Sequence, residues 1–287
     1  TVRDLIYPII KSVRGDISDS IDLVSAPERV DPGNRTFKHS NTPRVIGGMT
    51  PEATLRAANF YKSFTSEVNS VSGPEAAEAA KLLENTFRQV NIAFVNEFAQ
   101  VCRKLGVDVR EVIAAASSKP YGFMPFQPSA GVGGHCIPVD PLYLQARAKE
   151  FGLTSKYISV SQQVNNEMPK FVVERLDAES GGVKGKKVLV VGVSYKADIA
   201  DTRETPAESF IHHLKSAGAI VSWHDPLVAN WNGENSSAID GNYDLAVVLV
   251  SHSNFSMNGW KGGPIFSVNA HPNFPDWKPL ISVSPKK

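Results

Sequence analysis

The stretch Lys187-Val188-Leu189-Val190-Val191-Gly192-Val193 decides the fold class of this 287-residue chain. Its apolar residues run without alternation, which indicates a strand buried on both faces, as in a parallel sheet. A helical pattern over 206–218 and a second strand pattern over 220–223 follow it, and 244–250 is another apolar strand pattern. We therefore expect an α/β unit with a parallel sheet to begin after the glycine-rich boundary at 181–185.

Before this boundary the chain has mainly helical patterns. Residues 74–105 form one long pattern, which a proline opens and a glycine closes. It carries too many apolar residues for a single stripe, so we expect a helix that is buried on several sides, as in a dimer core. Further helices are expected over 108–116, 141–151 and 154–179.

The N-terminal part has a mixed pattern that resembles the end of a nucleotide-binding sheet. Its strands are too few to close such a sheet. At the other end of the chain, no element is predicted after about residue 257. The expected elements of this part are a helix over 1–14, strands over 22–25 and 44–48, and a helix over 51–64 that Thr50 caps. We expect an α/β chain in three parts, 1–68, 69–180 and 181–287.

Composition narrows the function classes. The chain is 42% hydrophobic with a formal net charge of +1 and no basic cluster, which argues against a nucleic-acid partner. No apolar run reaches the roughly 18 residues that cross a bilayer, so no membrane partner is expected. The two cysteines, Cys102 and Cys136, do not suit a disulfide scaffold and favour a reducing cytoplasm.

The long loop over 118–139 carries the sharpest chemical signal. Cys136 follows a run of glycines, which lets a ligand approach the backbone closely, and Asp140 comes four residues later. A thiol with an open approach and a nearby carboxylate is typical of a covalent catalyst. The same pattern also fits a buried structural thiol beside a glycine-rich loop.

Two further segments carry candidate site residues. Lys81 and Asn85 share one face of the long helix, where they need partners unless Lys81 is solvated. The segment 192–206 follows a buried strand and precedes a helix, which is where α/β sheets bind phosphates. Lys196 and Arg203 in this segment could bind phosphates or pair with neighbouring acids. Glu28, after the strand at 22–25, could be a site acid or base or a surface turn residue.

Four motifs occur in order along the chain. They are Pro27-Glu28-Arg29-Val30-x-Pro32-Gly33, Lys81-x3-Asn85, Gly133-Gly134-His135-Cys136-Ile137-Pro138-Val139-Asp140-Pro141 and Tyr195-Lys196-x-Asp198-x2-Asp201-x-Arg203-Glu204-x-Pro206. In this order they resemble the UDP-glucose/GDP-mannose dehydrogenase family over nearly all of the chain up to about residue 255. Arg29-Val30, His135 and Val139 make the chain more similar to the UDP-N-acetylhexosamine 6-dehydrogenases (of UDP-N-acetylmannosamine or UDP-N-acetylglucosamine) than to the UDP-glucose enzymes.

The resemblance implies two successive NAD-dependent oxidations of a C6 alcohol to a carboxylate. Cys136 would capture the C6 aldehyde as a thiohemiacetal that becomes a thioester. Lys81 and Asn85 would stabilise the oxyanion, Asp140 would orient or deprotonate the water that hydrolyses the thioester, and Glu28 could share the general-base work. No metal is implied.

The resemblance also implies the binding residues. The sugar would be held by Phe123, Phe126 and the loop of Gly131, Gly133 and Gly134. Lys196 would reach the site from a C-terminal UDP-binding domain, and Arg203 would approach the pyrophosphate of NAD. The implied partners are a UDP-sugar substrate and a second copy of the chain in a homodimer.

One departure from the family pattern keeps alternatives open. The Gly-x-Gly-x-x-Gly fingerprint of the family's N-terminal NAD-binding domain is absent from this sequence. We therefore expect most of that domain to be missing. The alternatives are a UDP-sugar-binding fragment without turnover, a UDP-glucose 6-dehydrogenase, and a thiol enzyme, such as a transferase, that needs no NAD.

Overall fold

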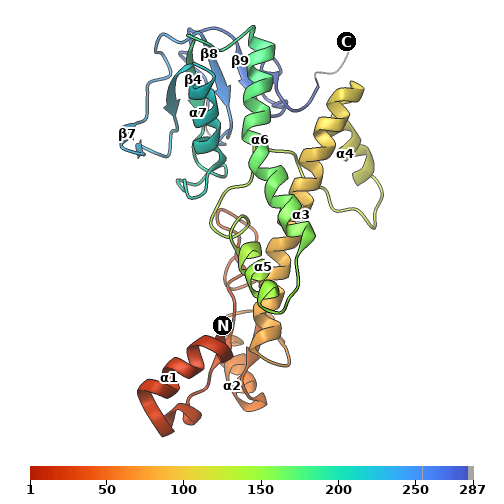
Figure 1. Cartoon of the computed structure of the whole chain (residues 1–287), viewed down its shortest axis with the longest axis vertical. Helices are drawn as coiled ribbons and strands as arrows, with labels where there is room; N and C mark the ends of the chain where they lie inside the picture. The colour runs from red at the N-terminus through yellow and green to blue at the C-terminus, as the bar shows by residue number, and fades with distance from the viewer. Residues whose placement is uncertain (254, 284–287) are drawn as a thin grey trace. The chain divides into compact units, whose positions relative to one another are not determined.

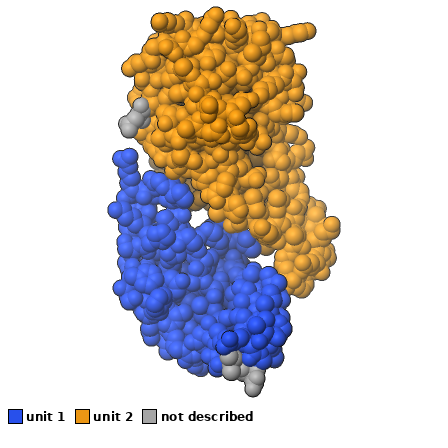
Figure 2. All heavy atoms as spheres, turned by 90° about the vertical axis from the view of Figure 1, so that its left-hand side faces the viewer, with its two compact units in different colours: residues 1–85 blue, residues 86–287 orange. Residues whose placement is uncertain are grey.

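The computed structural model describes residues 1–253 and 255–283 and divides into two compact units (Figure 2). The first unit is Thr1–Asn85 and the second is Thr86–Lys287, so the division falls inside the long helix. Among the described helices, none is long and apolar enough to cross a membrane. The division into three parts that the sequence predicts stays a prediction.

The first unit contains a small mixed sheet. Its elements are η1 (Val2–Ile6), α1 (Tyr7–Arg14), η2 (Gly15–Ser20), β1 (Val24–Ser25), β2 (Arg44–Gly48), α2 (Pro51–Tyr61), β3 (Val68–Ser70) and the start of α3 (Pro74–Leu105). The strand order is β1-β2-β3, with β1 antiparallel and β3 parallel to the buried β2. The Thr50 side chain caps α2 by accepting a hydrogen bond from the Ala53 N–H at 3.1 Å, as predicted. The strand β3 was not predicted.

The second unit holds the parallel sheet. After α3 its elements are α4 (Val109–Ser117), α5 (Asp140–Glu150), α6 (Lys156–Ser180), β4 (Lys187–Val191), α7 (Pro206–Ser216), β5 (Ile220–His224), β6 (Asn230–Trp231), β7 (Glu234–Asn235), β8 (Leu245–Val248), β9 (Ile265–Ser267) and β10 (Lys278–Pro279). The strand order is β10-β9-β8-β4-β5, and every pair in this sheet is parallel. Figure 1 labels β4, β8 and β9 of this sheet. The strands β9 and β10 extend the sheet into the region for which the sequence predicted no element.

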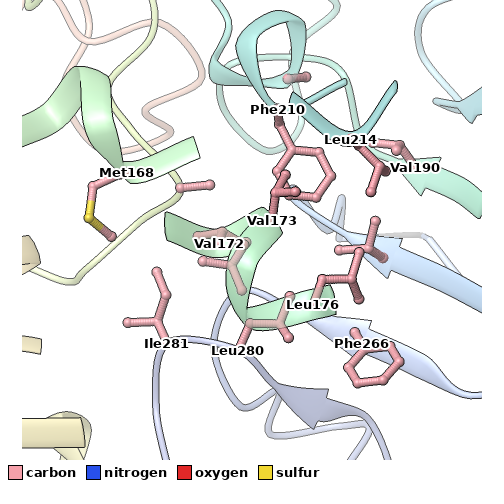
Figure 3. Packing of buried hydrophobic residues seen from close by; sticks show 14 of the residues in the cluster. Met168, Val172, Val173, Leu176, Val190, Phe210, Leu214, Phe266, Leu280 and Ile281 are labelled. Atoms are coloured by element: carbon pink, nitrogen blue, oxygen red, sulfur yellow. The ribbon is translucent and has the colours of Figure 1, made fainter. Parts of the chain in front are cut away.

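Strand β4 is buried on both faces, as its unbroken apolar run predicted. Val188 and Val190 pack into one hydrophobic cluster, whereas Leu189 and Val191 pack into a second cluster. In the first cluster, residues of α6 lie against residues of α7, the sheet and the C-terminal segment (Figure 3). The labelled α6 residues are Met168, Val172, Val173 and Leu176. This core holds β4 and its neighbouring strands in place, and polar residues of the second unit follow the ends of these strands.

Helix α3 has the predicted bounds but not the predicted burial. Its buried positions include small and amide side chains, namely Ala77, Asn85, Gln89, Ala93, Asn96 and Ala99. Large apolar side chains are exposed on it, with Leu83 at 67% and Phe94 at 66%, together with Phe87, Val101 and Leu105. The single chain therefore does not bury this helix on several sides, and its burial in a dimer core stays a prediction. The apolar pattern marks where such residues lie on a helix, but it does not show what covers them.

Candidate functional site

The structure separates the two thiols by exposure. Cys136 is exposed in the loop before α5, whereas Cys102 is buried in α3, and neither is part of a disulfide. The alternative of a buried structural thiol at Cys136 is therefore wrong. An exposed thiol can be reached by a substrate, which a covalent catalyst requires.

Asp140 is one helical turn from Cys136. The Asp140 N–H donates to the Cys136 carbonyl oxygen at 2.8 Å, which makes residues 136–140 a turn of helical geometry just before the body of α5. Residues four apart in such a turn lie on the same side. The half-buried Asp140 carboxyl is thus on the side of the turn that carries the thiol.

The glycines before Cys136 approach a segment of this same chain. A Cβ atom on Gly133 would lie 2.7 Å from the Tyr195 Cβ and 2.8 Å from the Pro206 Cδ. Gly134 has a φ of +84°, and a Cβ there would lie 2.9 Å from the Tyr195 ring. The Gly134 N–H also donates to the Arg203 carbonyl oxygen at 3.0 Å. The loop that carries Cys136 therefore packs directly against the loop between β4 and α7, because its glycines leave room for Tyr195 and Pro206.

A pair of buried asparagines holds the start of the same loop. Asn96 on α3 accepts a hydrogen bond from the Ser129 N–H at 2.8 Å and donates to the Asn165 side chain on α6 at 3.0 Å. Ser129 in turn donates through its hydroxyl to the Gly131 carbonyl oxygen at 2.7 Å. Sequence reasoning missed both asparagines, although an amide in an apolar helix signals a required hydrogen bond.

Arg203 pairs within the chain, which was one of the two possibilities that the sequence left open. Its guanidinium contacts the Asp201 carboxylate at 2.6 Å, and the Arg203 side chain remains 66% exposed. This hydrogen bond is the largest cause of the raised pKa of Arg203, to which the nearby Tyr195 and Cys136 contribute. It also lowers the pKa of Asp201, which burial only partly offsets. A positive charge thus lies within electrostatic reach of the thiol. Lys196 is half-buried on the same loop.

Phe123 and Phe126 line an apolar hollow of about 650 Å³ beside α3 and α4. The Phe126 ring lies edge-on to Phe87, with 5.8 Å between the ring centroids. Among the described residues that line this hollow are neither Cys136 nor Gly131–Gly134. Phe126 thus packs against α3, both rings line a hollow bounded by residues of α3 and α4, and their contact with a sugar stays a prediction.

The first unit brings Glu28 and Lys81 together. The Lys81 ammonium donates to the Glu28 carbonyl oxygen, and Asn85 is buried one turn further along α3. The Glu28 carboxylate accepts from the Val30 N–H at 2.7 Å and contacts Arg44 at 2.8 Å. Burial alone would raise the pKa of Glu28, but these contacts outweigh it and lower the pKa. Glu28 is thus a weaker base than an ordinary glutamate.

Arg44 is a residue that sequence reasoning missed. It is only 5% exposed at the start of β2, and a buried guanidinium must be paired. Its partners are Glu28 and the ring nitrogen of His39 at 3.1 Å. The sequence signal for this buried pair was an arginine at the start of an apolar strand.

The predicted site residues are divided between the two units. The second unit contains Cys136, Asp140, Lys196 and Arg203, and the first contains Glu28, Lys81 and Asn85.

Two family models match this chain. The central domain of the UDP-glucose/GDP-mannose dehydrogenase family matches residues 75–167, and the UDP-binding domain of that family matches residues 189–270.

Proteins of known name agree with these matches. A UDP-N-acetyl-D-mannosamine dehydrogenase of Methanococcus vannielii is 34% identical over 83% of this chain and 56% of the relative. A UDP-N-acetyl-D-glucosamine 6-dehydrogenase of Pseudomonas aeruginosa is 33% identical over 82% of this chain and 58% of the relative. The solved UDP-D-ManNAc dehydrogenase of Pyrococcus horikoshii superposes with a TM-score of 0.77 at 30% identity, over 91% of this chain and 65% of that one.

The chain thus spans a little over half the length of the curated relatives that it matches. Its two matched domains, its motif order and its fold agree, and the chain belongs to the UDP-glucose/GDP-mannose dehydrogenase family.

Proposed function

We propose that this chain acts in the oxidation of the C6 alcohol of a UDP-N-acetylhexosamine to the uronic acid, as a nucleotide-sugar 6-dehydrogenase. The observation that carries the proposal is the exposed Cys136, seated through Gly134 on the loop that holds Lys196 and Arg203. The names of the relatives support the substrate class, because they include both a UDP-N-acetylmannosamine and a UDP-N-acetylglucosamine enzyme.

In this proposal Cys136 is the nucleophile. Its sulfur adds to the C6 aldehyde and gives a thiohemiacetal, whose oxidation leaves a thioester on the same sulfur. Water then attacks the thioester carbon, which releases the carboxylate and returns the thiol. Asp140, on the same side of the turn as the thiol, orients that water or takes its proton.

The remaining site residues bind or polarise the substrate. We propose that Lys81 and Asn85 stabilise the developing oxyanion and that Glu28, with its lowered pKa, supports the water step as a carboxylate. We propose that Lys196 binds the nucleotide part of the substrate. The residues proposed to line the sugar are Phe123, Phe126, Gly131, Gly133 and Gly134.

The proposed cofactor is NAD, which when bound would accept the two electrons that each oxidation removes. The fit rests on Arg203, whose side chain is 66% exposed even while it is paired with Asp201. An exposed arginine suits an anionic pyrophosphate, and the hydrogen bond from the Gly134 N–H to the Arg203 carbonyl oxygen holds this residue beside the loop that carries the thiol. In the cytoplasm, a reducing compartment, the thiol would stay free for this role.

The role of Cys136 is tested by alkylation and by turnover. We expect iodoacetamide to modify Cys136 and not the buried Cys102 in the native chain, and a UDP-N-acetylhexosamine to slow that reaction at least about tenfold when the sugar covers the thiol. In a form of the protein that makes the acid with NAD, Cys136→Ser should lose at least about a thousandfold in that rate, measured by chromatography, while the control Cys102→Ser keeps it.

Two results would contradict the proposal. An alkylation rate that no UDP-sugar changes would remove Cys136 from the substrate site. Acid formation by Cys136→Ser at the wild-type rate would remove it from the chemistry. A panel of UDP-N-acetylmannosamine, UDP-N-acetylglucosamine and UDP-glucose in the alkylation assay identifies the preferred sugar.

We also propose that a second copy of the chain covers α3. The exposed residues Leu83, Phe87, Phe94 and Val101 recur at intervals of four and seven along the helix, the spacing of a helix–helix interface. Phe87 and Phe94 also line the apolar hollow, which extends this surface. Phe94→Glu should convert a dimer to a monomer in light scattering, whereas Leu153→Glu, also at an exposed apolar position, should not. A monomeric wild-type chain at micromolar concentration would contradict the proposal.

A further inference from the structure

Three neighbouring strands of the parallel sheet end in polar residues that the proposed chemistry does not use. Ser194 follows β4, Asp225 comes directly after β5, and His252 follows β8. These strands are adjacent and parallel in the order β8-β4-β5, so their carboxyl ends meet at one edge of the sheet. All three residues are buried, with exposures of 0%, 2% and 5%.

Asp225 is the centre of this group. Its Oδ2 accepts hydrogen bonds from the Val193 N–H at 2.9 Å and from the Ser194 N–H and hydroxyl, both at 3.0 Å. Its Oδ1 accepts from the Leu227 N–H at 2.9 Å and lies 3.1 Å from the His252 Nε2. The carboxylate therefore holds the start of the loop between β4 and α7, which begins at Gly192.

The contacts of His252 determine which of its nitrogens carries the proton. Its Nδ1 lies 2.9 Å from the backbone N–H of Asp198, and because that group can only donate, Nδ1 must accept. The proton therefore lies on Nε2, which donates to Asp225. The ring thus connects the carboxylate at the end of β5 to the middle of the β4–α7 loop.

The backbone at Asp198 needs such support. Asp198 has a φ of +63°, a left-handed conformation that costs energy for a residue with a side chain. Its carboxylate accepts from the Ser253 N–H at 2.7 Å and from the Ser253 hydroxyl. Residues 252 and 253 therefore hold both the backbone and the side chain of Asp198, which fixes the loop at a point between Lys196 and Arg203.

This loop is the seat of the Cys136 loop. Its Arg203 carbonyl oxygen accepts from Gly134, and its Tyr195 fills the space that glycine leaves at 133 and 134. We propose that His252 is a positioning residue, whose Nδ1 acceptor holds Asp198 and thereby the loop on which Gly134 and Cys136 are seated. The effect of His252 on catalysis rests on the proposed function. Its effect on the position of Gly134, through Asp198 and the β4–α7 loop, does not.

A matched pair of variants tests the acceptor. Asparagine and leucine have the same branched shape, and the asparagine oxygen can replace Nδ1 as the acceptor for the Asp198 N–H, whereas leucine cannot. We expect His252→Leu to speed amide hydrogen exchange at Asp198 and Gly134 by about tenfold or more, the effect of losing one buried hydrogen bond. We expect His252→Asn to stay within about threefold of wild type at both amides.

Two controls separate a local from a global effect. Exchange at Val190 in β4, a buried core strand, reports global unfolding, so a loss of overall stability would speed Val190 and Gly134 by the same factor, whereas a local effect speeds Gly134 more. His224→Asn alters a different histidine, the last residue of β5, whose Nδ1 contacts the Ser237 carbonyl oxygen at 2.7 Å. This variant should leave the exchange rate of the Gly134 amide unchanged. Equal exchange at Gly134 in the leucine and asparagine variants would overturn the proposal.

A chemical readout completes the test. The alkylation rate of Cys136 by iodoacetamide, without any nucleotide, should change in His252→Leu and return to the wild-type value in His252→Asn. A rate that follows the thermal midpoint of each variant rather than the presence of the acceptor would reduce His252 to a stability residue. Neither measurement needs turnover, so failure here is distinct from failure of the proposed dehydrogenase function.

Discussion

One aspartate pair in each unit lies in an environment opposite to that of the other. In the first unit, Asp22 pairs with Arg56 at the surface, where the side chains are 40% and 62% exposed. In the second unit, Asp225 pairs with His252 in the interior, where the side chains are 0% and 4% exposed. The same residue type therefore makes a screened surface pair in one unit and a buried hydrogen-bond centre in the other.

Both carboxyls have a lowered pKa, but for different reasons. The hydrogen bond from Arg56 is the largest cause at Asp22, and burial only partly offsets it. At Asp225 burial is the largest influence and would raise the pKa, but the N–H groups of Leu227 and Ser194 and the His252 ring together outweigh it. A lowered pKa alone therefore does not show how much a carboxylate contributes to the free energy of unfolding.

The largest expected effect separates the two aspartates directly. Asp225→Ala should lower the free energy of unfolding by about 3–5 kcal/mol, because it leaves buried N–H groups and a buried ring without their acceptor. Asp22→Ala should leave the urea midpoint within experimental error, because water replaces the lost partner. Urea unfolding followed by circular dichroism measures both, and equal losses in the two variants would contradict the comparison.

A smaller effect should appear on acidification. Because the folded pKa of Asp225 is lowered, its contribution is fully present above the unfolded pKa of about 3.9 and is lost as the pH falls through the folded value. The stability difference between wild type and Asp225→Asn should therefore shrink below about pH 4. Asp22→Asn should show no comparable convergence, and a pH-independent gap for Asp225→Asn would show that its charge is not involved.

Local pattern predicted most elements of this chain. The unbroken apolar run at β4, the cap at Thr50 and the bounds of α3 follow from neighbouring residues alone, so the sequence was sufficient to predict them. The exposure of Cys136 was one of two open possibilities, because a glycine-rich approach fits both a site thiol and a buried one. β3 was missed because it is three residues long and its residues after Val68 are exposed.

The partners of the site residues are long-range, and only the tertiary structure decided them. The sequence showed that glycines precede Cys136, but not that Tyr195, some sixty positions later, fills the space beside them. The pairing of Arg203 with Asp201 is local by contrast, because the two residues are two positions apart, and the sequence had left it open beside the binding of a phosphate. Hydrogen bonds between distant residues leave no local period, so sequence reasoning also missed Arg44 and Asn96.

Buried strands, helix ends and motif order are properties of contiguous residues, so the α/β class, the parallel sheet, the long helix and the resemblance to the family could be predicted from them. The tertiary structure decided that α3 exposes an apolar face, that Phe123 and Phe126 lie against α3 and α4, and that Asp225 and His252 hold the loop beneath Gly134. The physical reason is that burial and hydrogen bonding depend on which strand ends the fold brings together, and parallel strands bring together residues that are far apart in the chain.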